Sequence, residues 1–222
     1  YYFASIENEG KDFRTTKAEI ATSVVKDSQG AIVRINPDKK VIYLIFSADS
    51  MFQGGEKIIN TLAKNKIKGS FFLTGNFARL PQMKPVIERM IYAGHYVGAH
   101  SDRHLLYAPW GKRDISLVAG DSLVNDIKRN ILELEKFGIK PSDASWFLPP
   151  YEWYNKESVY TASLLGFKTI NYTPGTATPA DYTEPSMKSY KTSRELMDKL
   201  FAFEKEKNLN GALILIHPGV VA

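Results

Sequence analysis

The feature that most constrains the fold of this chain is a regular alternation of short apolar runs with longer amphipathic stretches. Apolar runs occur at 41–46, 69–75, 96–99, 146–148, 167–172 and 211–217, and helical periodicity falls between them at 54–67, 82–93, 122–138, 156–165 and 193–208. Such an alternation predicts parallel strands covered by helices. No linker-like stretch interrupts it, so we expect one continuous α/β sheet that curls like a barrel rather than two domains.

The composition rules out several functional classes. The chain has no cysteine, so disulfide bonds and thiol nucleophiles are excluded. Its net charge of +5 comes from lysines and arginines dispersed among acidic residues, which does not indicate a nucleic-acid partner. The longest apolar runs are too short to cross a bilayer, and the opening residues, YYFASIENEG, do not resemble a signal peptide. We therefore expect no nucleic-acid binding and no integral membrane segment.

Polar residues follow the ends of the predicted strands. In parallel β/α proteins the carboxyl ends of the strands meet on one face, and that face carries the functional site. Residues from distant segments should therefore converge there: Ser47, Asp49, Thr74, Gly75, His100, Pro149, Pro150, Tyr172, Thr173 and His217. The pattern predicts that two histidines far apart in the sequence share a site with an acid.

Three of the four histidines lie in the stretch HYVGAHSDRH at 95–104. His100 and His104 are four residues apart, a spacing at which two imidazoles can hold one cation such as zinc. Packed or solvated polar pairs have the same spacing, so the spacing alone leaves both interpretations open. His95 precedes the strand, at its opposite end, and is expected to be partly buried and satisfied by the backbone.

Four segments of the chain resemble the polysaccharide deacetylases, carbohydrate esterase family 4. KIKGSFFLTGNFAR (66–79) is similar to the family's second-strand segment, and GHYVGAHSDRH (94–104) to its metal-binding histidine segment. FLPPYEWYN (147–155) resembles the R-P-P-Y-G motif of the substrate groove, and LILIHPG (213–219) the closing L-x-H motif. The resemblance runs from about Val41 to His217. It implies an α/β fold, a distorted (β/α) barrel with fewer than eight strands.

The first motif of the family, T-F-D-D-G, is altered in this chain. In the family its first Asp is the general base and its second binds the metal, whereas Ser47 and Ala48 stand at those positions here and Asp49 follows one residue late. The family's base-holding arginine is Leu148 here. The two losses fit each other, because a buried arginine without its carboxylate would be an unpaired charge that costs several kcal/mol.

The resemblance implies a metal site formed by Asp49, His100 and His104. Zinc is the expected ion, with cobalt or nickel as alternatives, because neutral imidazole and carboxylate suit these divalent cations. Asp49 is the acid nearest the end of its strand, and a short loop could carry it to the ion. The other interpretation of Asp49 is a turn-capping residue, which is common in such loops.

The resemblance also implies catalytic and substrate-binding residues. His217 is expected to be the catalytic acid, and Asp181 either orients it or is an ordinary loop residue. Glu152, at the place of a family glycine, and Asp49 are the candidates for the missing base, and Glu152 could instead be a surface acid or a partner for sugar hydroxyls. The residues expected to contact the substrate come from the third and last motifs: Pro150, Tyr151, Trp153 and Leu215.

These residues predict a metal-dependent hydrolase that removes N- or O-linked acetyl groups from a polysaccharide or peptidoglycan. The alternative is a catalytically impaired, carbohydrate-binding relative that keeps the groove without the base–arginine pair. We expect one domain of residues 1–222, with 1–40 as an N-terminal extension and 41–222 as the catalytic core. The expected partner is an acetylated polysaccharide or oligosaccharide, and a polymeric substrate favours an extracellular or cell-envelope location.

Overall fold

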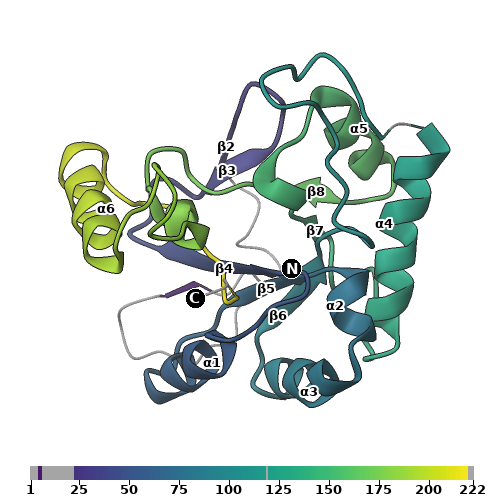
Figure 1. Cartoon of the computed structure of the whole chain (residues 1–222), viewed down its shortest axis with the longest axis horizontal. Coiled ribbons are helices and arrows are strands. Elements are labelled where there is room, and N and C mark those ends of the chain that lie inside the picture. The colour runs from purple at the N-terminus through teal and green to yellow at the C-terminus, as the bar shows by residue number, and fades with distance from the viewer. Residues whose placement is uncertain (1–4, 7–22, 119, 220–222) are drawn as a thin grey trace.

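The computed structural model describes residues 5–6, 23–118 and 120–219. Its centre is one mixed sheet in the order β2-β3-β9-β4-β5-β6-β7-β8, with β1 paired to the beginning of β4 (Figure 1). The strands are β1 Ser5–Ile6, β2 Val24–Lys26, β3 Ile32–Ile35, β4 Ile42–Ala48, β5 Ser70–Leu73, β6 Tyr96–Ala99, β7 Trp146–Phe147, β8 Lys168–Thr169 and β9 Ala212–Ile216. The strands from β9 through β8 pair in parallel, as the alternating pattern predicts.

The sheet curls far enough for its two ends to meet. Strand β3 pairs antiparallel with β9, and Ile32 of β3 also forms a bridge with Ile170, directly after β8. The hydroxyl of Thr173 donates to the carbonyl of Val33 at 2.5 Å and accepts from the N–H of Leu213 at 2.9 Å, which joins the same three segments. The expected distorted (β/α) barrel is confirmed. In the described residues its sheet has nine strands, of which β9 and β4 to β8 pair in parallel.

The two faces of the curled sheet have separate cores, because successive side chains of a strand point to opposite faces. Tyr43 and Ile45 of β4 pack with Leu213 and Leu215 of β9 in the cluster that fills the interior. Phe46 faces outward and packs with the helices. Burial of one such side chain stabilises the fold by about 1.5–3 kcal/mol, so the two clusters fix the register of the strands.

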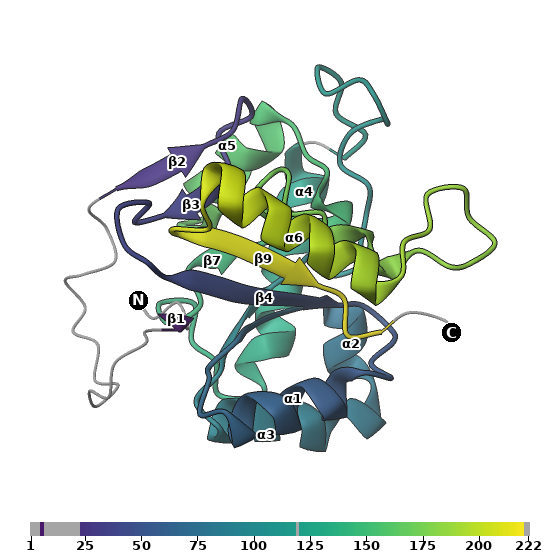
Figure 2. The same cartoon turned by 90° about the vertical axis from the view of Figure 1, so that its left-hand side faces the viewer.

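Helices cover the outside of the curl (Figures 1 and 2). Helix α6 lies along β9, and α1 to α5 cover the strands from β4 to β8, as Figure 2 shows from the side of α6. The helices are α1 Gly55–Lys64, α2 Gly75–Arg79, α3 Lys84–Tyr92, α4 Gly120–Glu135, α5 Lys156–Leu164 and α6 Ser193–Lys207, with short 3-10 turns η1 Pro81–Met83, η2 Pro150–Glu152 and η3 Thr178–Tyr182. Within the described part of the chain, no helix combines the length and hydropathy that a bilayer crossing requires.

The strand expected at 167–172 is shorter than its sequence pattern indicates. Only Lys168 and Thr169 pair with β7, and the chain then turns to β3, where the N–H of Asn171 donates to the carbonyl of Ile32 at 2.9 Å. Strand β4 is longer than expected, so Ser47 and Ala48 belong to the strand and Asp49 is the first residue after it. Both differences arise from pairing with segments distant in the sequence, and the second affects the site.

Candidate active site

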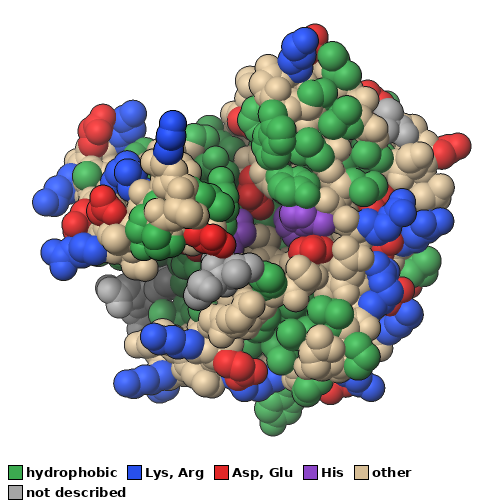
Figure 3. Space-filling model, in the orientation of Figure 1, with side chains coloured by type: hydrophobic (Ala, Val, Ile, Leu, Met, Phe, Trp, Pro, Cys, Tyr) green, Lys and Arg blue, Asp and Glu red, His purple; other side chains and the backbone are tan. Residues whose placement is uncertain are grey.

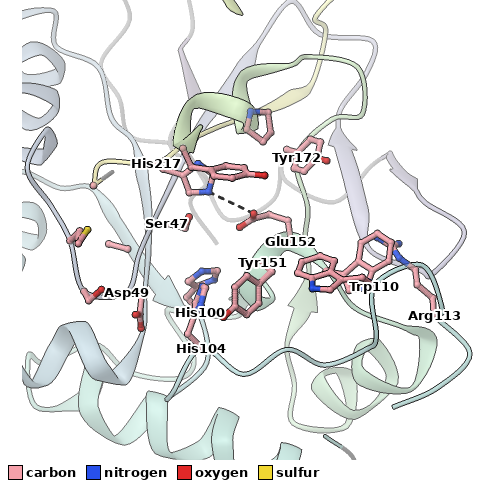
Figure 4. A pocket seen from close by; sticks show the side chains of 17 residues that line it. Ser47, Asp49, His100, His104, Trp110, Arg113, Tyr151, Glu152, Tyr172 and His217 are labelled. Carbon is pink, nitrogen blue, oxygen red and sulfur yellow. Dashed lines mark ion pairs between the residues drawn. The ribbon is translucent and has the colours of Figure 1, made fainter. Parts of the chain in front are cut away.

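A pocket of about 580 Å³ opens at the carboxyl ends of the parallel strands. Figure 3 shows histidine side chains at its base, in a hollow bordered by hydrophobic and acidic side chains. Its lining includes most of the residues expected from the sequence: Ser47, Asp49, His100, His104, Tyr151, Glu152, Trp153, Tyr172 and His217. Figure 4 shows how eight of them face one another: Ser47, Asp49, His100, His104, Tyr151, Glu152, Tyr172 and His217. The convergence expected of the strand ends is present.

His100 and His104 lie side by side at the end of β6, with ring centroids 5.1 Å apart. Nδ1 of His100 lies 2.7 Å from the carbonyl oxygen of Leu148, which can only accept a hydrogen bond, so Nδ1 carries the proton and Nε2 keeps its lone pair. Burial lowers the pKa of both imidazoles, and mutual repulsion lowers it further for His100. Both rings are therefore neutral at neutral pH, the form that binds metal.

The short loop that carries His104 is fixed from below by a buried carboxylate. Asp126 of α4 accepts hydrogen bonds from the hydroxyl of Ser101 at 2.6 Å, the hydroxyl of Tyr107 at 3.0 Å and the N–H of Arg103 at 3.2 Å. Ser101 in turn accepts from the N–H of His104 at 3.1 Å. This network holds His104 in a left-handed backbone conformation, with φ of 55°.

Asp49 does not complete a metal site with the two histidines. One of its carboxylate oxygens accepts from the hydroxyl of Thr74 at 3.0 Å and from the side-chain amide of Asn76 at 3.2 Å. Over the described ranges, no three His, Asp or Glu side chains are grouped closely enough to hold an ion. The predicted three-ligand site is therefore not formed, because the acid follows β4 one residue later than the family's metal-binding aspartate and its side chain leaves the strand in a different direction.

His217, at the end of β9, lies between two carboxylates. Its Nδ1 is 2.6 Å from Oδ1 of Asp181, and its backbone N–H donates to Oδ2 of the same residue at 2.8 Å. Its Nε2 forms an ion pair with Oε2 of Glu152 at 3.7 Å, the dashed line in Figure 4. Burial lowers the pKa of His217, but the hydrogen bonds and charges of Asp181 and Glu152 outweigh burial and raise it to about 10. The imidazole is protonated at neutral pH.

The backbone around Glu152 is unusual for residues with side chains. Tyr151 has φ of 57° and Glu152 has φ of 52°, two consecutive left-handed residues without a glycine. Such conformations cost on the order of 1–3 kcal/mol each and persist only where the surroundings enforce them. The side-chain amide of Asn171 donates to the carbonyl of Glu152 at 3.2 Å and helps to hold the turn. The turn directs Glu152 toward His217.

Two predicted substrate contacts lie outside the pocket lining. Leu215 is fully buried in the interior cluster of the barrel, and Pro150 is buried beneath the turn that carries Glu152. Leu148, at the position of the family's arginine, is also fully buried, and Ser47 lines the pocket where the family has its base. Leu215 therefore supports the site from the core, which corrects its assignment as a substrate contact.

Sequence reasoning missed several pocket residues, among them Trp110 and Arg113. Both lie in the loop between β6 and α4 and line the pocket. The indole of Trp110 contacts the ring of Tyr151, with centroids 5.9 Å apart, and that of Trp153, with centroids 5.5 Å apart. The guanidinium carbon of Arg113 lies 3.7 Å from the ring centroid of Trp153. The usable signal was the stretch APWGKR, which follows the same strand end as the histidine pair.

The family model of the polysaccharide deacetylases matches residues 34–170, more than half of the chain. The chain belongs to the polysaccharide deacetylase family. The matched range of this polysaccharide deacetylase family member begins in β3 and ends just after β8, so it contains the histidine pair and Glu152. It stops before Asp181 and His217. The family and fold expected from the motifs are confirmed, and the roles of single residues stay predictions.

Curated relatives of this family member are moderately similar to it. An uncharacterised protein of Bacillus subtilis, YlxY, is 26% identical over 188 residues, which cover 84% of this chain and 51% of the relative. The peptidoglycan-N-acetylmuramic acid deacetylase PdaA of Bacillus subtilis is 28% identical over 138 residues, which cover 61% of this chain and 47% of the relative. The chain thus spans about half the length of the curated relatives it matches.

Solved structures of carbohydrate esterase family 4 share the fold of this polysaccharide deacetylase family member. A pseudoenzyme from Bacillus anthracis has a TM-score of 0.61 at 22% identity, covering 86% of this chain and 59% of that one. A mutant described as that pseudoenzyme with restored enzymatic activity has a TM-score of 0.61 at 23% identity, covering 86% of this chain and 61% of that one. An esterase of Streptococcus mutans has a TM-score of 0.63 at 20% identity, covering 82% and 75%.

Proposed function

We propose that this chain hydrolyses acetyl groups on a polysaccharide or peptidoglycan, at N- or O-linked positions. The observation that carries the proposal is the placement of His217, a protonated imidazole at the pocket held between Asp181 and Glu152. An imidazole that carries its proton at neutral pH can protonate the leaving amine or alcohol. The family supports the reaction class, because its named members include a peptidoglycan deacetylase and a chitooligosaccharide deacetylase.

The proposed mechanism assigns opposite proton transfers to His217 and Glu152. Glu152 accepts a proton from the water that attacks the acetyl carbon, and His217 donates its Nε2 proton to the departing amine or alcohol. Asp181 keeps the imidazole oriented through Nδ1 and stabilises its charge. The backbone N–H of Tyr151 is the proposed donor to the tetrahedral oxyanion.

Metal dependence remains a prediction, with zinc as the expected ion and cobalt or nickel as alternatives. His100 and His104 supply two neutral imidazoles on one side of the pocket. Asp49 is the proposed third ligand, and its Oδ1 accepts hydrogen bonds from Thr74 and Asn76. A bound ion would polarise the acetyl carbonyl, and the proton transfers proposed above belong to Glu152 and His217.

The proposed substrate is an acetylated polysaccharide or oligosaccharide that lies against aromatic side chains. Tyr151 and Trp153 both line the pocket, and Tyr151 is half exposed. Flat apolar faces next to polar groups are suited to sugar rings, whose C–H faces are apolar and whose hydroxyls need partners. A polymeric substrate of this kind places the protein, as part of the proposal, outside the cell or in its envelope.

A second candidate function is carbohydrate binding without hydrolysis. The specific observation in its favour is the loss of the family's base and its arginine together, at Ser47 and Leu148, with no three-ligand metal group among the described residues. A family relative with a similar fold is described as a pseudoenzyme. In this alternative the aromatic pocket is retained for recognition and His217 contributes a charged hydrogen bond to the sugar.

Acetate release separates the two functions. Purified protein is incubated with acetylated chitooligosaccharide, peptidoglycan or acetylated xylan, with and without added zinc, while binding of the same sugars is measured by calorimetry. Hydrolysis by the wild type, slowed about 10²–10⁴-fold in His217→Ala, supports the deacetylase. Binding without acetate release supports the second candidate, and the combined variant Ser47→Asp, Ala48→Asp, Leu148→Arg then tests whether the missing groups restore turnover. A His217→Ala variant that works at full rate contradicts the role of His217.

A further inference from the structure

Arg113 is a cation at the pocket that forms no ion pair with any residue the structure describes. It comes from the loop between β6 and α4, lines the pocket and is partly buried. Its guanidinium carbon lies over the ring of Trp153, 3.7 Å from the ring centroid, and 5.2 Å from the ring centroid of Tyr154. Among the described residues it has no ion pair and no hydrogen bond, and its Nε is buried without a partner.

A partly buried arginine without an ion pair among the described residues is suited to bind an anion. A guanidinium has five N–H donors and rarely leaves them unused when it is covered by protein. Stacking on an indole fixes the plane of the group without using its terminal amino groups, which leaves them for a bidentate contact. The indole is itself held, because Nε1 of Trp153 donates to the carbonyl of Pro109, in the same loop, at 3.1 Å. The indole beneath the guanidinium is therefore anchored to the loop that carries Arg113.

A continuous row of rings connects Arg113 with the histidine pair. The ring of His104 lies 4.3 Å from that of Tyr151, Tyr151 contacts Trp110, and Trp110 contacts Trp153. Figure 4 shows Tyr151, Trp110 and Arg113 following one another away from His104. A sugar chain lying along this row would have its acetyl group at the histidine end and another substituent at the guanidinium.

We infer that Arg113 recognises a carboxylate on the acetylated glycan, so that the preferred substrate is an acidic acetylated sugar chain. This inference rests on the proposed function and names its substrate class. The carboxylate could be a lactyl ether on an acetylated sugar or the carboxyl group of a uronic acid, since both present the same planar anion to the fork of the guanidinium. A singly charged carboxylate suits this pocket better than a phosphate dianion, because Asp49 and Glu152 also line it.

The test compares binding of a neutral and of two acidic oligosaccharides by calorimetry at fixed pH and low salt. The probes are an N-acetylglucosamine tetramer, an N-acetylmuramic acid-containing tetrasaccharide, and an acetylated xylan oligosaccharide that carries glucuronic acid. We expect the wild type to bind at least one acidic probe about 10- to 100-fold more tightly than the neutral tetramer, the range of a charge-assisted hydrogen bond. The acidic probe that binds more tightly than the neutral tetramer identifies the source of the carboxylate.

Arg113→Gln should abolish this preference, so that the acidic probe loses more affinity than the neutral tetramer does. Lys112→Gln is the matched control: it removes the same charge from the adjacent, exposed residue outside the pocket lining and should keep the preference. Arg113→Lys keeps the charge without the planar fork and should fall between the two. Thermal unfolding of each variant checks that the loop is intact.

Three outcomes would overturn the inference. Equal binding of neutral and acidic probes by the wild type refutes carboxylate recognition but leaves the proposed deacetylase intact. If Arg113→Gln loses the same affinity for the neutral and the acidic probes, Arg113 only supports the ring of Trp153 and does not bind a carboxylate. Failure of every sugar to bind the wild type removes the proposed function as well as the inference.

Discussion

His217 has its acidity set by two carboxylates that compete with its burial. Asp181 contacts both the ring and the backbone N–H of His217, so it fixes the position and the protonation of the ring together. Glu152 faces the other ring nitrogen. The same three groups therefore govern the proposed chemistry and the dependence of stability on pH.

The raised pKa of His217 predicts that part of the folding stability is lost in alkaline solution. The folded chain holds this proton with a pKa of about 10, against an ordinary value of 6.5 in the unfolded chain. The stabilisation is thus complete below about pH 6.5 and is lost as the pH rises through 10. In Asp181→Asn the pKa should fall and this loss should shrink.

Urea unfolding of both proteins at pH 6, 8 and 10 measures the effect as the difference between their pH profiles. Taking the difference cancels the lysines and tyrosines that titrate in the same range and are common to both proteins. If the free energies of unfolding of the two proteins change with pH in the same way, Asp181 does not set the proton affinity of His217.

Metal binding is also decided by single side chains. With the carboxylate of Asp49 engaged by Thr74 and Asn76, zinc should bind through the histidine pair alone. We expect His104→Gln to abolish zinc binding and Asp49→Asn to leave its affinity unchanged, both measured by calorimetry at neutral pH. Loss of binding in Asp49→Asn would mean that the carboxylate turns to the ion, as the family resemblance implies.

At the scale of elements, α4 positions the loop that follows β6. Asp126 holds the loop from below, and the side chain of Asn130 accepts from the N–H of His100 at 2.9 Å and donates to the carbonyl of Leu73 at 3.0 Å. The apolar spacing of the sequence predicted helix α4. The roles of its two buried polar residues could not be predicted, because their partners lie 19 to 57 residues away in the sequence.

Asp126→Asn should destabilise the chain by about 1–3 kcal/mol. The amide replaces a buried charged acceptor with a weaker acceptor and adds donors that face three existing donors. The measurement is urea unfolding monitored by tryptophan fluorescence. Glu135→Gln, an exposed change on the same helix, is the control and should stay within about 0.5 kcal/mol of the wild type. Equal stabilities of the two variants would contradict the structural role of Asp126.

At the scale of the whole molecule, the barrel is completed by a strand outside the repeating strand–helix pattern. Strand β3 precedes the first predicted unit and joins β9 to the segment after β8. Sequence periodicity predicts which segments are strands and that neighbours run parallel. It does not predict which edges meet, because closure depends on hydrogen bonds between residues more than a hundred positions apart.

Thr173→Val tests the closure. Valine has the shape of threonine but no hydroxyl, so the carbonyl of Val33 and the N–H of Leu213 would each lose a buried partner. We expect a loss of about 1–3 kcal/mol for each unsatisfied group, seen as a lower urea midpoint. Thr61→Val, at an exposed site on α1, makes the same chemical change without burial and should have little effect. An unchanged urea midpoint in Thr173→Val would show that closure of the barrel does not need the hydroxyl of this residue.

The sequence by itself determined the elements of this protein and the residue types gathered at its pocket. Apolar periodicity is local, so the strands, the helices and the convergence of His100, His104 and His217 at one face followed from it. Only the tertiary structure decided what these residues contact: Asp49 is drawn to Thr74 and Asn76, Glu152 faces His217, and Leu215 is enclosed in the core. Each of these outcomes depends on which donors, acceptors and apolar surfaces folding brings together. Such contacts between distant segments cannot be read from the periodicity of the sequence.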